Sequence, residues 1–214
     1  MSKTYDVAVL GATGAVGETM LSILEQRKFP VGNVYPLASS RSAGGRIEFN
    51  GSHLTVQDVE TFDWSKAQIG LFSAGASVSA RWAPIAASHG CVVIDNTSQF
   101  RYDDDIPLVV PEVNAHKIAE HKNRGIIANP NCSTIQMLVA LKPIHDAVGI
   151  ERINVCTYQP CRAPARRRSR SWPARPPRCS TASPSSRRSI PSRSLSTCSR
   201  KSTCSWTTAT PRKK

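Results

Sequence analysis

The feature that most constrains the fold is an abrupt change of composition after Gln159. Residues 1–159 contain all 15 acidic residues and 13 Lys and Arg, a net charge of −2. Residues 160–214 contain 15 Lys and Arg and no acidic residue. With 12 Arg, 13 Ser and 8 Pro and no Gly, Val, Phe, Tyr or Met, they cannot bury a core. A packed structure is therefore expected in residues 1–159 and disorder in residues 160–214.

Apolar runs alternate with amphipathic segments along residues 1–159. The pattern predicts strands at 6–10, 34–38, 68–72, 91–95 and 125–128, and helices at 15–26, 78–89 and 133–147, the last with a break near Pro143. An alternating segment at 151–158 is predicted to start a new sheet. The strand–helix alternation favours an α/β fold with a doubly wound parallel sheet, whose ligands bind beyond the carboxyl ends of the strands.

A glycine-rich segment follows the first predicted strand. Gly11, Gly14 and Gly17 form a GxxGxxG pattern between that strand and the helix predicted at 15–26. Such glycines permit a tight turn and a close backbone approach to a pyrophosphate, and the helix N-terminus offers free N–H groups. We expect a dinucleotide here; a turn that only packs helix on strand is the alternative.

The loop after the second predicted strand favours NADP. An NAD-preferring site usually has an acidic residue about 20 residues beyond the glycines. This chain has Ser39-Ser40-Arg41-Ser42 there, whose hydroxyls and guanidinium suit the additional 2′-phosphate of NADP. The alternative is a polar loop with one solvated arginine.

Cys132 is placed as a nucleophile. It follows Asn129-Pro130-Asn131 and precedes the helix predicted at 133–147. The positive end of a helix dipole favours a thiolate, which can attack a carbonyl carbon. Beside a nicotinamide, that suggests a thiohemiacetal that loses hydride to give a thioester. Cys91 and Cys156 lie in predicted strands and are expected to be small buried side chains.

Other features bear on ligands and location. Arg101 follows the strand predicted at 91–95 and could clamp an anion, or it could pair with the acidic run 103–105. The five histidines show no metal-ligand spacing, so no metal site is expected. No apolar run reaches the roughly 18–20 residues of a membrane span, and no signal peptide is recognised. Three irregularly spaced cysteines in residues 1–159 suggest reduced thiols in the cytoplasm.

Five motifs together closely resemble aspartate-semialdehyde dehydrogenase. They are Gly11-Ala-Thr-Gly-Ala-Val-Gly17, Ser39-Ser-Arg-Ser42, Asp95-Asn-Thr-Ser98, Val109-Val-Pro-Glu-Val-Asn114 and Asn129-Pro-Asn-Cys-Ser-Thr134. The resemblance covers residues 1–159, less than half of a family member. It implies an NADP-binding domain at 1–131 and the start of an α+β catalytic and dimerisation domain at 132–159, in a homodimer.

The resemblance also implies an activity. Such enzymes reversibly convert aspartate 4-semialdehyde, inorganic phosphate and NADP to aspartyl 4-phosphate and NADPH, in the biosynthesis of lysine (through diaminopimelate), threonine and methionine. An acyl-phosphate reductase of the N-acetylglutamyl-phosphate type is the alternative from the same reaction class.

Individual residues receive roles from the same resemblance. Cys132 would be the acyl-thioester nucleophile, and Asn131 would shape its site. Arg101 would bind the phosphate, and Gln159 would orient the acyl intermediate. NADP would be held by Gly11, Thr13, Gly14, Ala15, Val16, Gly17, Ser39, Ser40, Arg41, Ser42, Ser73 and Gly75.

Residues 160–214 depart from the family. They lack its Ser-Gly-Ala-Gly cofactor loop, its catalytic histidine and its substrate-binding arginine. One interpretation is a nucleic-acid-binding extension rich in Arg and Ser. The other is a shifted reading frame, in which a nucleic-acid partner is not expected and the chain as written is inactive.

The genetic code favours the shifted frame. Joining the last base of each codon to the first two bases of the next codon gives the codons of the shifted frame. In that frame the junction Trp172–Pro173 must encode alanine, and the junction Trp206–Thr207 must encode aspartate. The junctions over 160–165 allow Val-Ser-Gly-Ala-Gly, which is the missing cofactor loop. A single base lost after the Gln159 codon would produce this pattern.

Overall fold

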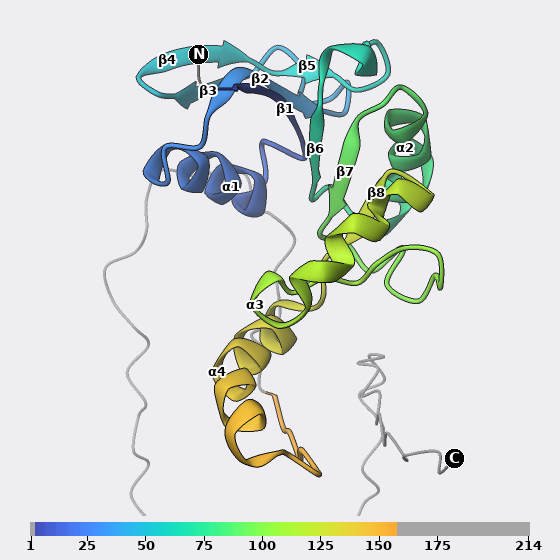
Figure 1. Ribbon diagram of the computed structural model, residues 1–214. Coiled ribbons are helices and arrows are strands. Elements are labelled where there is room, and N and C mark those ends of the chain that lie inside the picture. The colour runs from blue at the N-terminus through green and yellow to red at the C-terminus, as the bar shows by residue number, and fades with distance from the viewer. Residues whose placement is uncertain (1–2, 158–214) are drawn as a thin grey trace, which may run out of the picture. The chain divides into compact units, whose positions relative to one another are not determined.

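The computed structural model describes residues 3–157, which belong to the first of the two units into which the chain divides, Met1–Gln159 (Figure 1). The strands are β1 (Tyr5–Leu10), β2 (Val31–Ala38), β3 (Arg46–Phe49), β4 (Ser52–Thr55), β5 (Gln57–Asp58), β6 (Ile69–Phe72), β7 (Val92–Asp95) and β8 (Ile126–Ala128). The helices are α1 (Ala15–Gln26), α2 (Ala76–Ser88), α3 (Pro111–Asn114) and α4 (Cys132–Val148), with 3-10 helices η1 (Trp64–Lys66) and η2 (Ala115–Asn123).

Six strands form one parallel sheet in the order β5-β2-β1-β6-β7-β8. The chain starts at β1, builds outward through β2 to β5, and then returns to the other side of β1 with β6, β7 and β8. The topology therefore reverses beside β1, where ligands of such sheets bind. The predicted doubly wound parallel sheet is confirmed.

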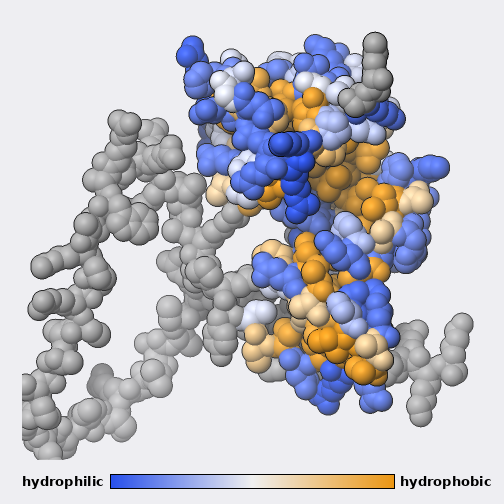
Figure 2. Space-filling model, turned by 60° about the vertical axis from the view of Figure 1, so that its left-hand side comes forward, coloured by the Kyte–Doolittle hydropathy of each residue, from blue (hydrophilic) through white to orange (hydrophobic). Residues whose placement is uncertain are grey.

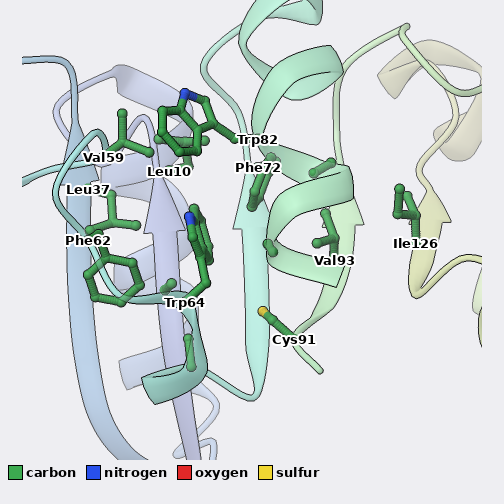
Figure 3. Packing of buried hydrophobic residues seen from close by; sticks show 14 of the residues in the cluster. Leu10, Leu37, Val59, Phe62, Trp64, Phe72, Trp82, Cys91, Val93 and Ile126 are labelled. Carbon is green, nitrogen blue, oxygen red and sulfur yellow. The ribbon is translucent and has the colours of Figure 1, made fainter. Parts of the chain in front are cut away.

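Alternate residues of β1 face two separate apolar cores. Val7 and Val9 pack with Leu21 of α1 on one side of the sheet. Ala8 and Leu10 belong to the larger cluster on the other side, which includes Trp82 of α2 (Figure 3). Because both faces of the strand are covered there, the buried part of β1, residues 7–10, is apolar and shows no polar alternation.

An antiparallel hairpin of β3 and β4 extends the structure beyond what the sequence analysis predicted. Asn50 and Gly51 form its turn, with φ angles of 48° and 72°. Two successive positive φ values are typical of the tight turn that Asn-Gly favours between antiparallel strands. The Asn50 N–H also donates to the Glu25 carboxylate, which ties the hairpin to α1.

The segment after β8 corrects two predictions. Helix α4 runs through Pro143: the fixed φ of proline suits a helix, and the helix continues despite the lost hydrogen bond and the crowding of the carbonyl four residues earlier. Residues 151–157 form no strand. A strand needs a neighbour for its backbone hydrogen bonds, and Ile153 and Val155 are 46% and 58% exposed.

Helix α4 has no buried residue although it is largely apolar. Its exposed apolar side chains include Val139, Ile144 and Val148. Figure 2 shows apolar surface at the lower end of the view, where Figure 1 places α4. Within the described residues α4 contacts α3, but these side chains remain exposed to solvent.

Candidate active site

The structure brings the predicted site residues to one edge of the sheet. The loops after β2, β1, β6, β7 and β8 contain them, and these strands are consecutive neighbours whose carboxyl ends share that edge. Gln159 lies outside the described residues. Among residues 3–157, no group of three or more side chains could ligate a metal ion, and no helix is long and apolar enough to cross a membrane.

The glycine-rich turn after β1 is closely packed. Gly11 has a φ of +90°, and a Cβ there would lie 3.0 Å from the Ala74 backbone nitrogen. A Cβ on Gly17 would collide with the Gly11 carbonyl oxygen and lie 2.7 Å from the Cα of Ala12. Thr13, Gly14 and Ala15 are exposed above this turn, and Val16 is half-buried. The start of α1 is therefore exposed to solvent, and the first-turn N–H groups of a helix are suited to bind a phosphate.

The loops after β2 and β6 flank this turn. Ser39, Ser40 and Arg41 are exposed, while Ser42 is half-buried and its N–H donates to the Ser39 carbonyl at 2.8 Å. No acidic side chain pairs with Arg41 among the described residues. After β6, Ser73 donates through its N–H and its hydroxyl to the Leu10 carbonyl, at 2.9 and 3.2 Å. Gly75, with a φ of +107°, is the N-cap of α2.

Cys132 is the first residue of α4, and its side chain is exposed. The N-cap is Asn131, whose Oδ1 accepts hydrogen bonds from the Ser133 N–H at 2.9 Å and the Ser133 hydroxyl at 2.6 Å. The Cys132 thiol lies 3.8 Å from the same oxygen. A cap of this kind stabilises a helix by about 1 kcal/mol. Asn131 therefore fixes the turn that presents the thiol to solvent.

Arg101 is half-buried and pairs with no carboxylate among the described residues. Its Nε donates to the Asn129 carbonyl at 2.9 Å, and one terminal nitrogen donates to the Asn96 carbonyl at 3.2 Å. The acidic run pairs instead with Arg124, which contacts Asp103 at 3.0 Å and Asp105 at 3.3 Å. The pairing of Arg101 with that run, one of the two sequence interpretations, is therefore wrong. Its positive charge stays available to an anion.

A polar network beneath this arginine was not predicted as part of the site. The buried carboxylate of Asp95 accepts from the Ser79 hydroxyl at 2.8 Å, and from the N–H and hydroxyl of Thr97 at 3.1 and 2.8 Å. One residue along, the Asn129 side-chain amide donates to Asn96 Oδ1 at 2.7 Å. Asp95, Asn96, Thr97 and Asn129 lie in the Asp-Asn-Thr and Asn-Pro-Asn motifs, and these motifs were the sequence features that could have indicated the network.

The two other described cysteines differ from each other. Cys91 is buried, as predicted, and burial raises the pKa of its thiol to about 12. Cys156 is exposed, which contradicts the prediction of a buried side chain. The cause is the missing strand, because residues 151–157 have no neighbouring sheet to pack against.

Comparison with known proteins agrees with this geometry. The profile of the family described as "Semialdehyde dehydrogenase, NAD binding domain" matches residues 6–121. The chain belongs to this family. The N-terminal 159 residues, 74% of the chain, are 70% identical to the aspartate-semialdehyde dehydrogenase of Shewanella violacea and 53% identical to that of Bacillus subtilis. The resemblance seen in the sequence motifs is confirmed.

Solved structures of relatives show the same fold. Aspartate semialdehyde dehydrogenase II of Vibrio cholerae, complexed with ASA, is 68% identical with a TM-score of 0.69, over 70% of this chain and 49% of that chain. The Candida albicans enzyme with NADP is 27% identical with a TM-score of 0.58, over 69% and 48% of the two chains. The chain spans about half the length of the relatives it matches, 47% for the Shewanella protein.

Proposed function

We propose that this semialdehyde dehydrogenase chain contains the NADP-binding half of an aspartate-semialdehyde dehydrogenase. The observation that carries the proposal is the order of loops along the sheet edge. The loops after β2, β1 and β6 contain the predicted cofactor residues, and the loops after β7 and β8 contain Arg101 and Cys132. A dinucleotide and an acyl substrate would thus bind side by side at the topological switch point.

The residues fit NADP. The close packing of Gly11 and Gly17 forms a tight turn between β1 and α1, and a pyrophosphate would bind at the exposed start of α1, with Thr13, Gly14, Ala15 and Val16 around it. Arg41, with Ser39, Ser40 and Ser42, would hold the 2′-phosphate, and Ser73 and Gly75 would line the rest of the cofactor. When bound, NADP supplies the hydride acceptor for oxidation of the aldehyde.

The chain's own residues would hold and activate the acyl group. The Cys132 thiolate adds to the aldehyde carbon and retains the acyl group as a thioester after oxidation. Inorganic phosphate, held by Arg101, then attacks the thioester and releases aspartyl 4-phosphate. Asn131 would keep the thiol at the start of α4, and Gln159 would orient the acyl group.

The wider biology follows from the same proposal. The enzyme would be a cytoplasmic homodimer in lysine, threonine and methionine biosynthesis, without a metal or a nucleic-acid partner. Residues 1–131 would form the NADP-binding domain, and residues 132–159 would begin the catalytic and dimerisation domain. An N-acetylglutamyl-phosphate type of reductase is less well supported, because the relatives named above are aspartate-semialdehyde dehydrogenases.

We further propose that residues 160–214 are encoded out of frame. Identity of 70% over 159 residues gives way to a composition without a core. Sequencing the coding DNA across codons 155–165 in independent isolates tests this. An intact frame would overturn the proposal and make the basic extension a nucleic-acid-binding candidate. A missing base would support it, and the 214-residue chain should then show no turnover, while the repaired gene should yield a dehydrogenase.

NADP binding to the 214-residue chain is the direct test of the cofactor site. Arg41→Ala should weaken NADP binding by about tenfold or more, because a hydrogen bond to a charged group contributes about 1.5–3 kcal/mol. NAD, which has no 2′-phosphate, should bind the variant and the wild type equally. The matched control is Arg46→Ala, because Arg46 is also exposed but lies on β3. Equal loss of NADP and NAD affinity would contradict the assignment.

A further inference from the structure

The loop after β7 and the loop after β8 are joined by an arginine and two asparagines. Arg101 donates to the backbone carbonyls of Asn96 and Asn129, one in each loop. The two asparagine side chains bond to each other at 2.7 Å, across 33 residues of sequence. The Asn129 N–H also donates to the Asp95 carbonyl at 2.8 Å. Three of these hydrogen bonds join the two loops, and the fourth, from Arg101 to Asn96, lies within the loop after β7.

These contacts determine where the guanidinium can lie. Two of its five N–H groups are used by the carbonyls, and they hold the group by its Nε and one terminal nitrogen. Both carbonyls are correctly placed only while the two loops keep their spacing. The β7–β8 ladder and the bond from the Asn129 N–H to the Asp95 carbonyl hold the loop ends together, and the asparagine bridge adds a side-chain contact between Asn96 and Asn129 themselves. Asn129 is also only three residues from Cys132, so the same loop holds the arginine and the nucleophile.

The first loop is itself anchored from below. The buried Asp95 carboxylate bonds to Thr97 on one side and to Ser79 of α2 on the other. Asn96 lies between Asp95 and Thr97 in the sequence, and its N–H donates to the Phe72 carbonyl at 2.9 Å. The bridge is thus built between a rigid loop and the loop that presents the thiol.

We propose that Asn96 and Asn129 are positioning residues, whose side-chain bridge holds the Arg101 guanidinium beside the Cys132 loop. This inference rests on the proposed function, in which Arg101 binds an anionic group next to the nucleophile. Neither asparagine touches the reacting atoms. Their effect on the reaction passes through the position of the arginine.

Charge-selective alkylation of the full 214-residue chain tests the proposal. Iodoacetate and iodoacetamide have similar size, but only iodoacetate carries a negative charge. A cation held near the thiolate speeds the first reagent relative to the second, by about two- to fivefold at low ionic strength over a separation on the order of 10 Å. The rate ratio at Cys132 is measured by peptide mass spectrometry. The exposed Cys156 in the same sample is the internal reference.

The variants separate the bridge from general stability. Arg101→Gln should reduce the ratio at Cys132 about two- to fivefold relative to the wild type, with the ratio at Cys156 unchanged, and Asn129→Ala should reduce it as far. The double variant should show no additional fall, because both changes remove the same effect. Asn114→Ala is the matched control: its side chain also makes two hydrogen bonds, to the Val110 N–H and the Leu108 carbonyl, and it should leave the ratio unchanged.

The outcomes distinguish this inference from the proposed function. If Arg101→Gln lowers the ratio but the asparagine variants do not, the positioning role is overturned and the anion-binding role survives. If Arg101→Gln has no effect, the anion-binding role fails as well. Asn96→Ala removes the bridge from its other end and replaces Asn129→Ala if that variant loses its far-UV circular dichroism. A normal ratio in Asn96→Ala overturns the proposal equally.

Discussion

Gly17→Ala tests whether close packing at the start of α1 forms the cofactor turn. Gly17 is buried, and an added Cβ would meet two backbone groups, the Gly11 carbonyl and the Cα of Ala12 at 2.7 Å. Backbone atoms cannot rotate aside as a side chain would, so α1 must move away from the end of β1. Overpacking typically costs about 1–3 kcal/mol, occasionally more. The higher helix propensity of alanine offsets this cost by about 1 kcal/mol at most.

We therefore expect a net loss of about 1–2 kcal/mol in the free energy of unfolding. For a domain of this size, that corresponds to a fall in Tm of about 2–8 °C. Because the same movement displaces the first-turn N–H groups, NADP affinity should also fall by about tenfold or more. Urea denaturation and calorimetry measure the first effect, and titration with NADP measures the second.

Gly14→Ala is the matched control for stability. Gly14 has a φ of −94°, and the nearest atom to an added Cβ is the Gly11 carbonyl oxygen at 3.4 Å, an ordinary contact. Gly14 is the N-cap of α1, where alanine is less favourable than glycine, and alanine restricts the unfolded chain; these opposing effects should leave a change within about 1 kcal/mol. If Gly17→Ala were as stable as Gly14→Ala and bound NADP like the wild type, the reasoning from close packing would be refuted.

Three more predictions concern the core and the surface. Burial raises the pKa of the Cys91 thiol from 9.0 to about 12, so the unfolded chain loses this proton at a lower pH than the folded chain. The folded state should therefore lose stability as the pH rises from about 9 to about 12, by at most about 1.4 kcal/mol per pH unit. Cys91→Ala should abolish that component in urea titrations at pH 8 and 10, and an unchanged slope would contradict it. Asp95→Ala leaves buried donors unpaired and should destabilise the chain by about 3 kcal/mol or more, measured by urea denaturation; wild-type stability would contradict it. Ile144→Lys and Val148→Lys replace side chains of α4 that are 51% and 78% exposed, and each should change stability by at most about 0.5 kcal/mol. Both should reduce self-association measured by light scattering, and unchanged association would show that this face of α4 does not mediate it.

Local sequence patterns predicted most strands of the sheet and the helices that pack on it. A strand buried on both faces is largely apolar, which made the runs at 7–10, 69–72 and 92–94 recognisable. The β3–β4 hairpin could also have been found, because Asn50-Gly51 is a strong turn signal between two segments in which apolar and polar residues alternate. Each of its strands has only four residues, the shortest length over which such alternation can be recognised.

The cofactor turn and the nucleophile were equally visible in the sequence, because each depends on neighbouring residues. Gly11 to Gly17 and Asn131-Cys132 owe their conformation to a strand end followed by a helix start, and that arrangement is local. The placement of these residues at the carboxyl ends of the strands followed from the α/β pattern alone.

Only the tertiary structure decided what happens between distant loops. Arg101 could have paired with the acidic run two residues away, but its partners are 5 and 28 residues away, at Asn96 and Asn129. The exposure of Cys156 likewise depends on whether residues 151–157 find a neighbouring strand. Strand order brings the β7 and β8 loops together, and sequence periodicity carries no information on which strands are neighbours. The sequence by itself therefore determined the local chemistry of this protein, whereas contacts of long sequence separation determined the geometry in which that chemistry is held.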